Sequence, residues 1–286
     1  MRKYVLYGQV QQRLNEHIAR FGAPFSFYEA VIELWSEQQF RETEGYVAPC
    51  FDEWDARSAA GFAACMDRAP VYLDYFSSED FECHTAAVAA ERIMPLDLIP
   101  MRIAYNQVMG IHSHDAFEMN YILGGSARLI TGGSQRTFRS GELALIAPRS
   151  EHDVIPEENS IVLSVSFWEH TIDDTLYRLI KGENIISRFF RTSLNRDKQG
   201  FLLLALPVTE DILRILRSIY SEGYSGEEYS KEICASYIEI LFSRLLRYHA
   251  GNKLYNEGGS QPDSSSLLSV LEYLRKNFRR TSLQQT

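Results

Sequence analysis

Three histidines and one glutamate have the spacing of a metal-binding or polar ligand-binding site. His112, His114 and Glu118 form an H-x-H-x-x-x-E pattern, and His152 follows in the run PRSEH. On one extended strand, residues at even positions face the same side. Three imidazoles and a carboxylate on one face suit a divalent transition metal such as zinc, nickel, manganese or iron.

The residues around this pattern have the periodicity of a sheet. Short β-prone runs separated by Gly-rich turns predict strands, and such a series is typical of an all-β barrel or sandwich. The expected strands are 103–109, 119–123, 127–131, 135–139, 143–147 and 161–167. The pair Gly132-Gly133 predicts a two-residue hairpin between two of them.

Helical patterns flank this β region. Before it, Gly22-Ala23-Pro24 should end a first helix, Ser26 and Glu29 should form a capping box, and 52–66 should hold a third helix. After it, 209–220 and 227–249 should form a helical hairpin, with Ser225 capping the second helix. An apolar stripe follows that second helix and either packs on the barrel or forms a dimer interface: Ile233, Tyr237, Ile240, Leu241 and Leu245.

Composition excludes several classes of protein. Apolar residues make up 45% of the 286 residues, which is enough for a packed core. The net charge of −9 argues against this chain binding nucleic acid by itself. No run of 18 apolar residues predicts a membrane span, and Met1 to Gln9 lacks the pattern of a signal peptide. The scattered cysteines lack a C-x-x-C pair and indicate reduced thiols in a cytoplasmic protein: Cys50, Cys65, Cys83 and Cys234.

Two stretches resemble the paired motifs of cupins. His112 to Gly125 is similar to the first cupin motif and Gly141 to His152 to the second, although Asn106 and Ser150 stand where those motifs normally have glycine. The resemblance implies that His112, His114, Glu118 and His152 are the metal ligands. The run HSHDAFEMNYILGGSARLITGGSQRTFRSGELALIAPRSEHDV looks like the sensor domain of AraC-type bacterial transcription regulators.

This resemblance implies an α+β chain with a central cupin-like β-barrel, an N-terminal helical extension and a C-terminal helical hairpin. The expected units are a helical extension of unknown role (1–85), a ligand-sensing barrel (86–170), a helical dimerisation region (171–250), a flexible linker (251–265), and the first helix with the stub of a helix-turn-helix DNA-binding domain (266–286). The implied protein is a non-enzymatic, cytoplasmic homodimer that responds to a small-molecule effector such as a sugar and meets DNA only through a truncated C-terminal domain.

Alternatives to this interpretation remain open at the level of sequence. The four side chains could line an organic ligand pocket without a metal, or serve a metal-dependent cupin dioxygenase or isomerase, or belong to a stand-alone binding module. Further candidate pocket residues are Tyr105, Asn120, Asp115 and Glu142, although strand phase alone does not fix the faces on which they lie. The basic helix after the linker favours the regulator over the enzyme.

Overall fold

The computed structural model describes residues 1–23, 25–44, 51, 54, 59–73, 98–103, 105, 110–132, 134–168, 184–193, 200–225 and 227–249. The expected linker (251–265) and terminal segment (266–286) lie outside this part of the chain, as do Cys50 and Cys83. The helices, strands and contacts of the molecule are those of the described residues.

In its described residues, the N-terminal unit combines helices with a small sheet. The helices are α1 (Tyr7–Phe21), α2 (Phe27–Ser36) and α3 (Ala59–Met66), and the strands β1 (Arg2–Leu6), β2 (Arg41–Thr43) and β3 (Pro70–Tyr72) lie in the order β2-β1-β3. Gly22 ends α1 in the left-handed conformation, and Ser26 and Glu29 form the predicted capping box. The sheet was not expected, because strands of three to five residues carry little periodicity.

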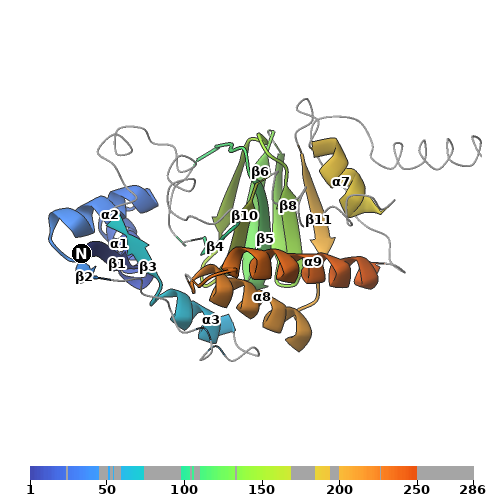
Figure 1. Cartoon of the computed structure of the whole chain (residues 1–286). Coiled ribbons are helices and arrows are strands. Elements are labelled where there is room, and N and C mark those ends of the chain that lie inside the picture. Colours follow the sequence, from blue (N-terminus) through green and yellow to red (C-terminus); the bar gives the residue numbers. More distant parts are fainter. Residues whose placement is uncertain are drawn as a thin grey trace, which may run out of the picture.

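Two antiparallel sheets form the centre of the molecule (Figure 1). The first has the order β11-β8-β5-β10-β4, with β4 at Leu98–Arg102, β5 at Phe117–Gly124, β8 at Glu142–Ile146, β10 at Ile161–Phe167 and β11 at Phe201–Ala205. The second has the order β7-β6-β9, with β6 at Ser126–Thr131, β7 at Ser134–Arg139 and β9 at His152–Pro156. We call these two sheets together the barrel.

Side chains from both sheets meet inside the barrel. The buried apolar cluster there includes Ile122, Ala144 and Val162 from the first sheet and Leu129, Phe138 and Val154 from the second. Their alternation along each strand follows the two-residue period of a sheet. The expected α+β class with a central cupin-like sheet region is therefore confirmed.

The strand predictions fail where the chain gives no clear alternation. Five expected strands are present, and Thr131 pairs with Ser134 across the predicted Gly132-Gly133 hairpin. Most of the strand expected at 103–109 lies outside the described residues, and the strand described next to it is β4 at Leu98–Arg102. The sequence analysis missed β9 and β11. Each of these two is only five residues long, and β11 is a continuous apolar run, which periodicity does not distinguish from helix.

A helical hairpin lies against the first sheet (Figure 1). After α7 (Ile185–Ser193) and β11, the chain forms α8 (Glu210–Gly223), capped by Thr209, and α9 (Ser230–His249). The expected start of α9 was wrong. Ser225 accepts a hydrogen bond from the Glu227 amide in a turn before the helix, which begins five residues later at Ser230.

The stripe predicted along α9 is divided between core and surface. Leu241 and Leu245 are fully buried, whereas Ile233 and Ile240 keep 38% and 45% of their surface exposed, and Tyr237 lies between these extremes. The apolar face of α9 is therefore only partly buried, and part of it remains open to solvent.

One hydrophobic core joins the N-terminal unit to the barrel and the hairpin. The ring of Tyr220 on α8 packs edge-on against Phe62, with ring centroids 5.0 Å apart, and against Phe51 at 5.9 Å. The N-terminal unit thus packs on the same helix as the first sheet of the barrel. Cys65 and Cys234 are both buried, and burial raises the pKa of Cys234 to about 12, which suits a structural rather than a reactive cysteine. In the described part of the chain, no helix combines the length and the apolar character needed to cross a membrane.

Candidate functional site

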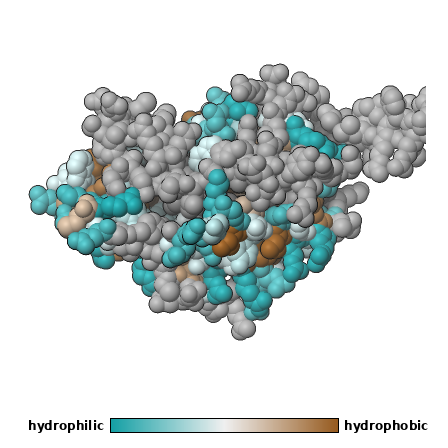
Figure 2. Space-filling view, in the orientation of Figure 1, coloured by the Kyte–Doolittle hydropathy of each residue, from teal (hydrophilic) through white to brown (hydrophobic). Residues whose placement is uncertain are grey.

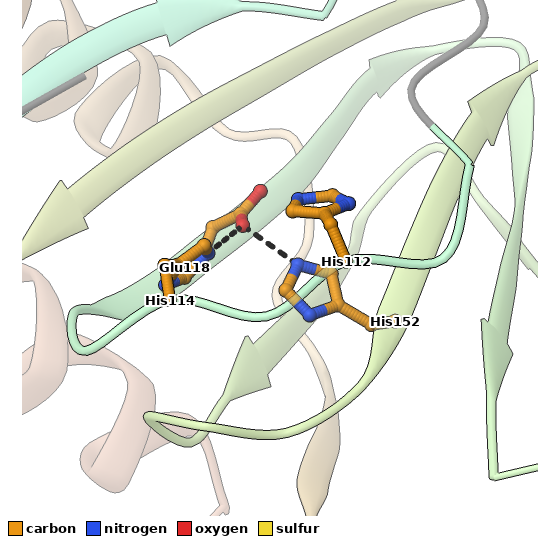
Figure 3. Close-up of side chains that lie close together, drawn as sticks. All are labelled: His112, His114, Glu118 and His152. Carbon is orange, nitrogen blue, oxygen red and sulfur yellow. Dashed lines mark hydrogen bonds and ion pairs between the residues drawn. The ribbon is translucent and has the colours of Figure 1, made fainter. Parts of the chain in front are cut away.

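The four predicted ligand residues converge at one end of the barrel interior (Figure 3). Each of them offers one nitrogen or oxygen atom, and these four atoms all lie within 4.8 Å of one another. Glu118 lies on β5 and His152 begins β9, so the site joins the two sheets.

The structure corrects the expectation that one strand carries the first three residues. Only Glu118 belongs to β5, whereas His112 and His114 lie in the loop before it. Gly110, at φ +71°, adopts a left-handed conformation that glycine tolerates, and two residues later the chain meets the first residue of β9 in an antiparallel bridge. There His112 and His152 exchange two backbone hydrogen bonds of 3.0 and 2.9 Å. The convergence is therefore produced by a turn and a bridge rather than by strand alternation.

The backbone fixes the orientation of all three imidazole rings. The Nδ1 atoms of His112, His114 and His152 lie 2.8–3.0 Å from the carbonyl oxygens of Gly110, Ala116 and Ser150. Since a carbonyl only accepts, each Nδ1 carries a proton and donates it. Each Nε2 atom is then the one left for a ligand, which is the arrangement that backbone carbonyls commonly impose on metal-binding histidines.

Glu118 is the centre of the cluster. Its Oε2 atom lies 2.9 Å from Nε2 of His114 and 3.0 Å from Nε2 of His152. Its Oε1 atom accepts hydrogen bonds from Nδ2 of Asn120 at 2.9 Å and Oγ of Ser164 at 3.0 Å. Asn120 and Ser164 donate to this buried carboxylate, and each of the two imidazoles donates to it through Nε2 when its ring carries both protons.

These contacts shift the pKa values of the site in opposite directions. Burial by itself would raise the pKa of Glu118, but the hydrogen bonds from His114 and His152 outweigh it and hold that pKa well below its usual value. Burial would lower the pKa of His152, but the Glu118 carboxylate outweighs it and raises that pKa. Burial, followed by the charge of His152, lowers the pKa of His112. The metal-free site thus favours an ion pair between Glu118 and His152, with His112 neutral.

The donor set fits a transition metal. Two ligands on opposite sides of one ion, each at about 2.1 Å, lie about 4.2 Å apart. The widest separation here is 4.8 Å, so a small inward movement would bring all four atoms into coordination distance. Three imidazole nitrogens and one carboxylate oxygen suit zinc, iron, manganese or nickel.

The other residues that the sequence suggested for the pocket differ in whether they contact this cluster. Asn120 belongs to it, and its Oδ1 atom is buried without a hydrogen-bond partner in the described part of the chain. Asp115 is exposed and pairs with Arg149, and Glu142 accepts a hydrogen bond from the Arg139 amide in the turn between β7 and β8. Gln11 of α1 holds the backbone of Tyr105 through two hydrogen bonds of 2.7 and 3.0 Å. The role of Tyr105 in ligand binding stays a prediction.

Sequence reasoning missed Ser164. It lies on β10, in the run IVLSVSF, where Ser164 and Ser166 interrupt apolar residues with a two-residue period. That alternation was the available signal, because it places both hydroxyls on the face that points into the barrel. The partner of Ser164, Glu118, is 46 residues away in the chain.

Comparisons with known proteins identify the class of this domain. Residues 102–176, which include the whole cluster, match the family model of the AraC-like ligand binding domain. This part of the chain is therefore similar to AraC-like ligand-binding domains, as the sequence resemblance implied. No protein with a curated function matches the chain in sequence.

Solved structures give weaker likenesses. An apo variant of ToxT from Vibrio cholerae strain SCE256 is 15% identical, with 57% of this chain covering 61% of that chain at a TM-score of 0.40. Wild-type ToxT from the same strain, bound to an unsaturated fatty acid, is 15% identical, with 56% covering 57% at 0.34. A Cupin 2 conserved barrel domain protein from Salinispora arenicola CNS-205 is 23% identical, with 28% covering 68% at 0.24. This chain thus spans about three fifths of the ToxT chains, and the class assignment rests on the family model.

The opposed pKa shifts predict a pH-dependent contribution of Glu118 to stability. With metal removed, Glu118→Gln should lower the free energy of unfolding by about 3 kcal/mol at pH 5–6, because it leaves buried partners without their counter-charge. His152 has a raised pKa, so its pairing stabilises fully below about pH 6.5 and is lost as pH rises through that raised value. Glu118 has a lowered pKa, so its contribution is present above about pH 4.3 and is lost as pH falls further.

Denaturant unfolding in the presence of EDTA, at intervals from pH 3.5 to 9, measures this difference. Glu151→Gln, an exposed carboxylate next to His152, is the matched control and should give a small, flat difference. A difference for Glu118→Gln that does not change with pH would contradict the ion pair.

Proposed function

We propose that this chain is the effector-sensing and dimerisation portion of an AraC-type transcription regulator. The observation that carries the proposal is the position of the polar cluster inside a barrel whose sequence matches the AraC-like ligand binding domain. Function then follows from differential binding. An effector that binds one arrangement of the dimer more tightly than another shifts the population toward it.

The barrel interior favours a small molecule with a polar group and an apolar body. Along β5, the inward side chains pass from Glu118 through Asn120 to Ile122, and the neighbours of Ile122 in the interior are apolar. The polar group of the effector would meet the histidines, and its remainder the apolar side chains next to them. Sugars and amphipathic acids are the two classes to test first.

A divalent metal is a proposed, not obligatory, component of this site. His112, His114, Glu118 and His152 would hold it, and it would supply a positive charge for an oxygen-bearing group of the effector. The same ligand set supports a second candidate function, a metal-dependent cupin dioxygenase or isomerase. An enzyme would keep an open coordination position and turn over its substrate, whereas a sensor would release the effector unchanged.

A hydrogen-bonded route links the site to the helical hairpin. Ser164 donates its hydroxyl proton to Glu118, and its backbone carbonyl accepts a hydrogen bond of 3.2 Å from the hydroxyl of Tyr220 on α8. A movement of Glu118 on effector binding would thereby reach the helix that packs against α9. This route is what the proposed regulator needs between its effector and its dimer.

The exposed face of α9 is the proposed dimer interface. Apolar atoms lie open to solvent over α9 in Figure 2, and Ile233 and Ile240 are the exposed aliphatic residues on this helix. A two-fold interface would place this patch against itself. DNA contact would come from a helix-turn-helix domain that begins within 266–286 and brings the regulator to its site on DNA.

Loss of the two loop histidines should weaken effector binding without dissociating the dimer. In a thermal-shift screen against sugars, unsaturated fatty acids and small aromatic compounds, an effector at 100 times its Kd should stabilise the wild type by about 2.7 kcal/mol. The double variant His112→Ala/His114→Ala should lose most of this shift. Asp115→Asn, in the same loop but exposed, should keep it. An effector that stabilises the double variant as strongly as the wild type would refute binding at this cluster.

Charged residues on α9 should separate the dimer into folded monomers. Light scattering should give twice the chain mass for the wild type and one chain mass for Ile233→Glu/Ile240→Glu, with an unchanged circular dichroism spectrum, because both side chains are exposed in the monomer. Leu241 is unsuitable for this test because it is buried in the core. Val208→Glu, at an exposed apolar residue outside α9, should remain dimeric. A wild-type monomer, or a dimeric double variant, would contradict the assignment of this interface.

A further inference from the structure

We propose that Ser164 and Asn120 are positioning residues that turn a single oxygen of Glu118, Oε2, toward the imidazoles, so that Glu118 binds a metal ion through that oxygen alone. The inference rests on the proposed metal site and deepens it. It begins with the two oxygens of the carboxylate, which have different partners. Oε2 meets His114 and His152, whereas Oε1 meets Asn120 and Ser164.

The lone pairs of Oε1 are already occupied. A carboxylate oxygen has about two acceptor sites, and both on Oε1 are taken by bonds of 2.9 and 3.0 Å. A bidentate carboxylate would have to turn Oε1 toward the ion and break these bonds. Since the Ser164 hydroxyl and the Asn120 amide are buried, their loss of a partner would cost free energy. The two partners of Oε2 are different in kind, because His114 and His152 would coordinate the ion through Nε2 and would then no longer donate to Oε2. The bonds to Oε1 therefore favour monodentate coordination through Oε2.

The sheet fixes both positioning residues. Asn120 lies two residues after Glu118 on β5, on the same face, and Ser164 is the cross-strand neighbour of Asn120 on β10. Neither residue can approach Glu118 from another direction while this register holds. The carboxylate is thus oriented before any ion binds, which is how supporting hydrogen bonds strengthen metal sites.

Ser166 provides an internal comparison. It lies on the same strand and the same face as Ser164, it is also buried, and it is the cross-strand partner of Glu118 itself. The hydroxyl that bonds to Glu118 is nevertheless that of Ser164. Ser164→Ala and Ser166→Ala make the same small change in side-chain volume. A difference in metal binding between these two variants therefore reports the loss of the hydrogen bond from Ser164 to Glu118.

The test measures binding of Zn²⁺ and Co²⁺ to the whole chain without any effector. Ser164→Ala should raise the metal Kd about 10-fold or more, as loss of supporting hydrogen bonds to metal ligands typically does. Ser166→Ala should leave the Kd within about two-fold of the wild type, and Ser164→Thr, which keeps the hydroxyl, should restore much of the affinity. The visible absorption of bound Co²⁺ should change in Ser164→Ala, because Oε1, then held by Asn120 alone, can turn toward the ion more easily.

The outcomes separate this inference from the proposed function. A wild type that binds neither ion removes the metal site, and this inference with it, but leaves effector sensing to be judged by the effector screen. Metal binding that is equal in Ser164→Ala and Ser166→Ala overturns the positioning role while the metal site stands. A crystal structure of the Zn²⁺-loaded wild type gives a reading that needs no variant. Coordination through Oε2 alone supports the proposal, and bidentate Glu118 refutes it.

Discussion

The buried carboxylate of Glu118 is the constraint that organises the site. An ionised carboxylate away from water is costly unless donors or a cation surround it. Glu118 is 8% exposed, and its four neighbours come from the loop before β5, from β5 itself, from β9 and from β10. The two sheets and the loop must therefore be assembled together before this charge is compensated, which ties the geometry of the site to the packing of the barrel.

This dependence extends outward to the helices. Ser164 connects Glu118 to Tyr220 of α8, and the ring of Tyr220 packs on Phe62 of the N-terminal unit. The same unit reaches the chain that leads to the site, because Gln11 of α1 holds the backbone of Tyr105. The N-terminal residues, for which the sequence predicted no role, thus contact both the hairpin and Tyr105, which precedes His112 in the chain. A ligand that moves Glu118 acts on a structure in which these parts share one core.

Local signals explain what could be predicted from the sequence. The H-x-H-x-x-x-E pattern and His152 predicted which side chains meet, and Gly-rich turns predicted most strands of the barrel. The same reasoning wrongly assigned His112 and His114 to one strand with Glu118, because the turn at Gly110 and the bridge to β9 depend on tertiary packing. It also missed Ser164, since strand register over 46 residues is not a local property. The apolar stripe on α9 was visible, but only packing divides it into core and surface.

The central claim is that the barrel site communicates with the helical hairpin. Hydrogen exchange measured by mass spectrometry tests it most directly, with the protein compared in the presence and absence of saturating Zn²⁺ or of an effector found by screening. We expect slower exchange in the loop around His112 and His114 and in β9, together with a change in α8 near Tyr220, 56 residues away from Ser164 in the chain. Ligand-induced protection confined to the loop and β9, with α8 and α9 unchanged, would show a binding site without the proposed communication and would contradict this claim.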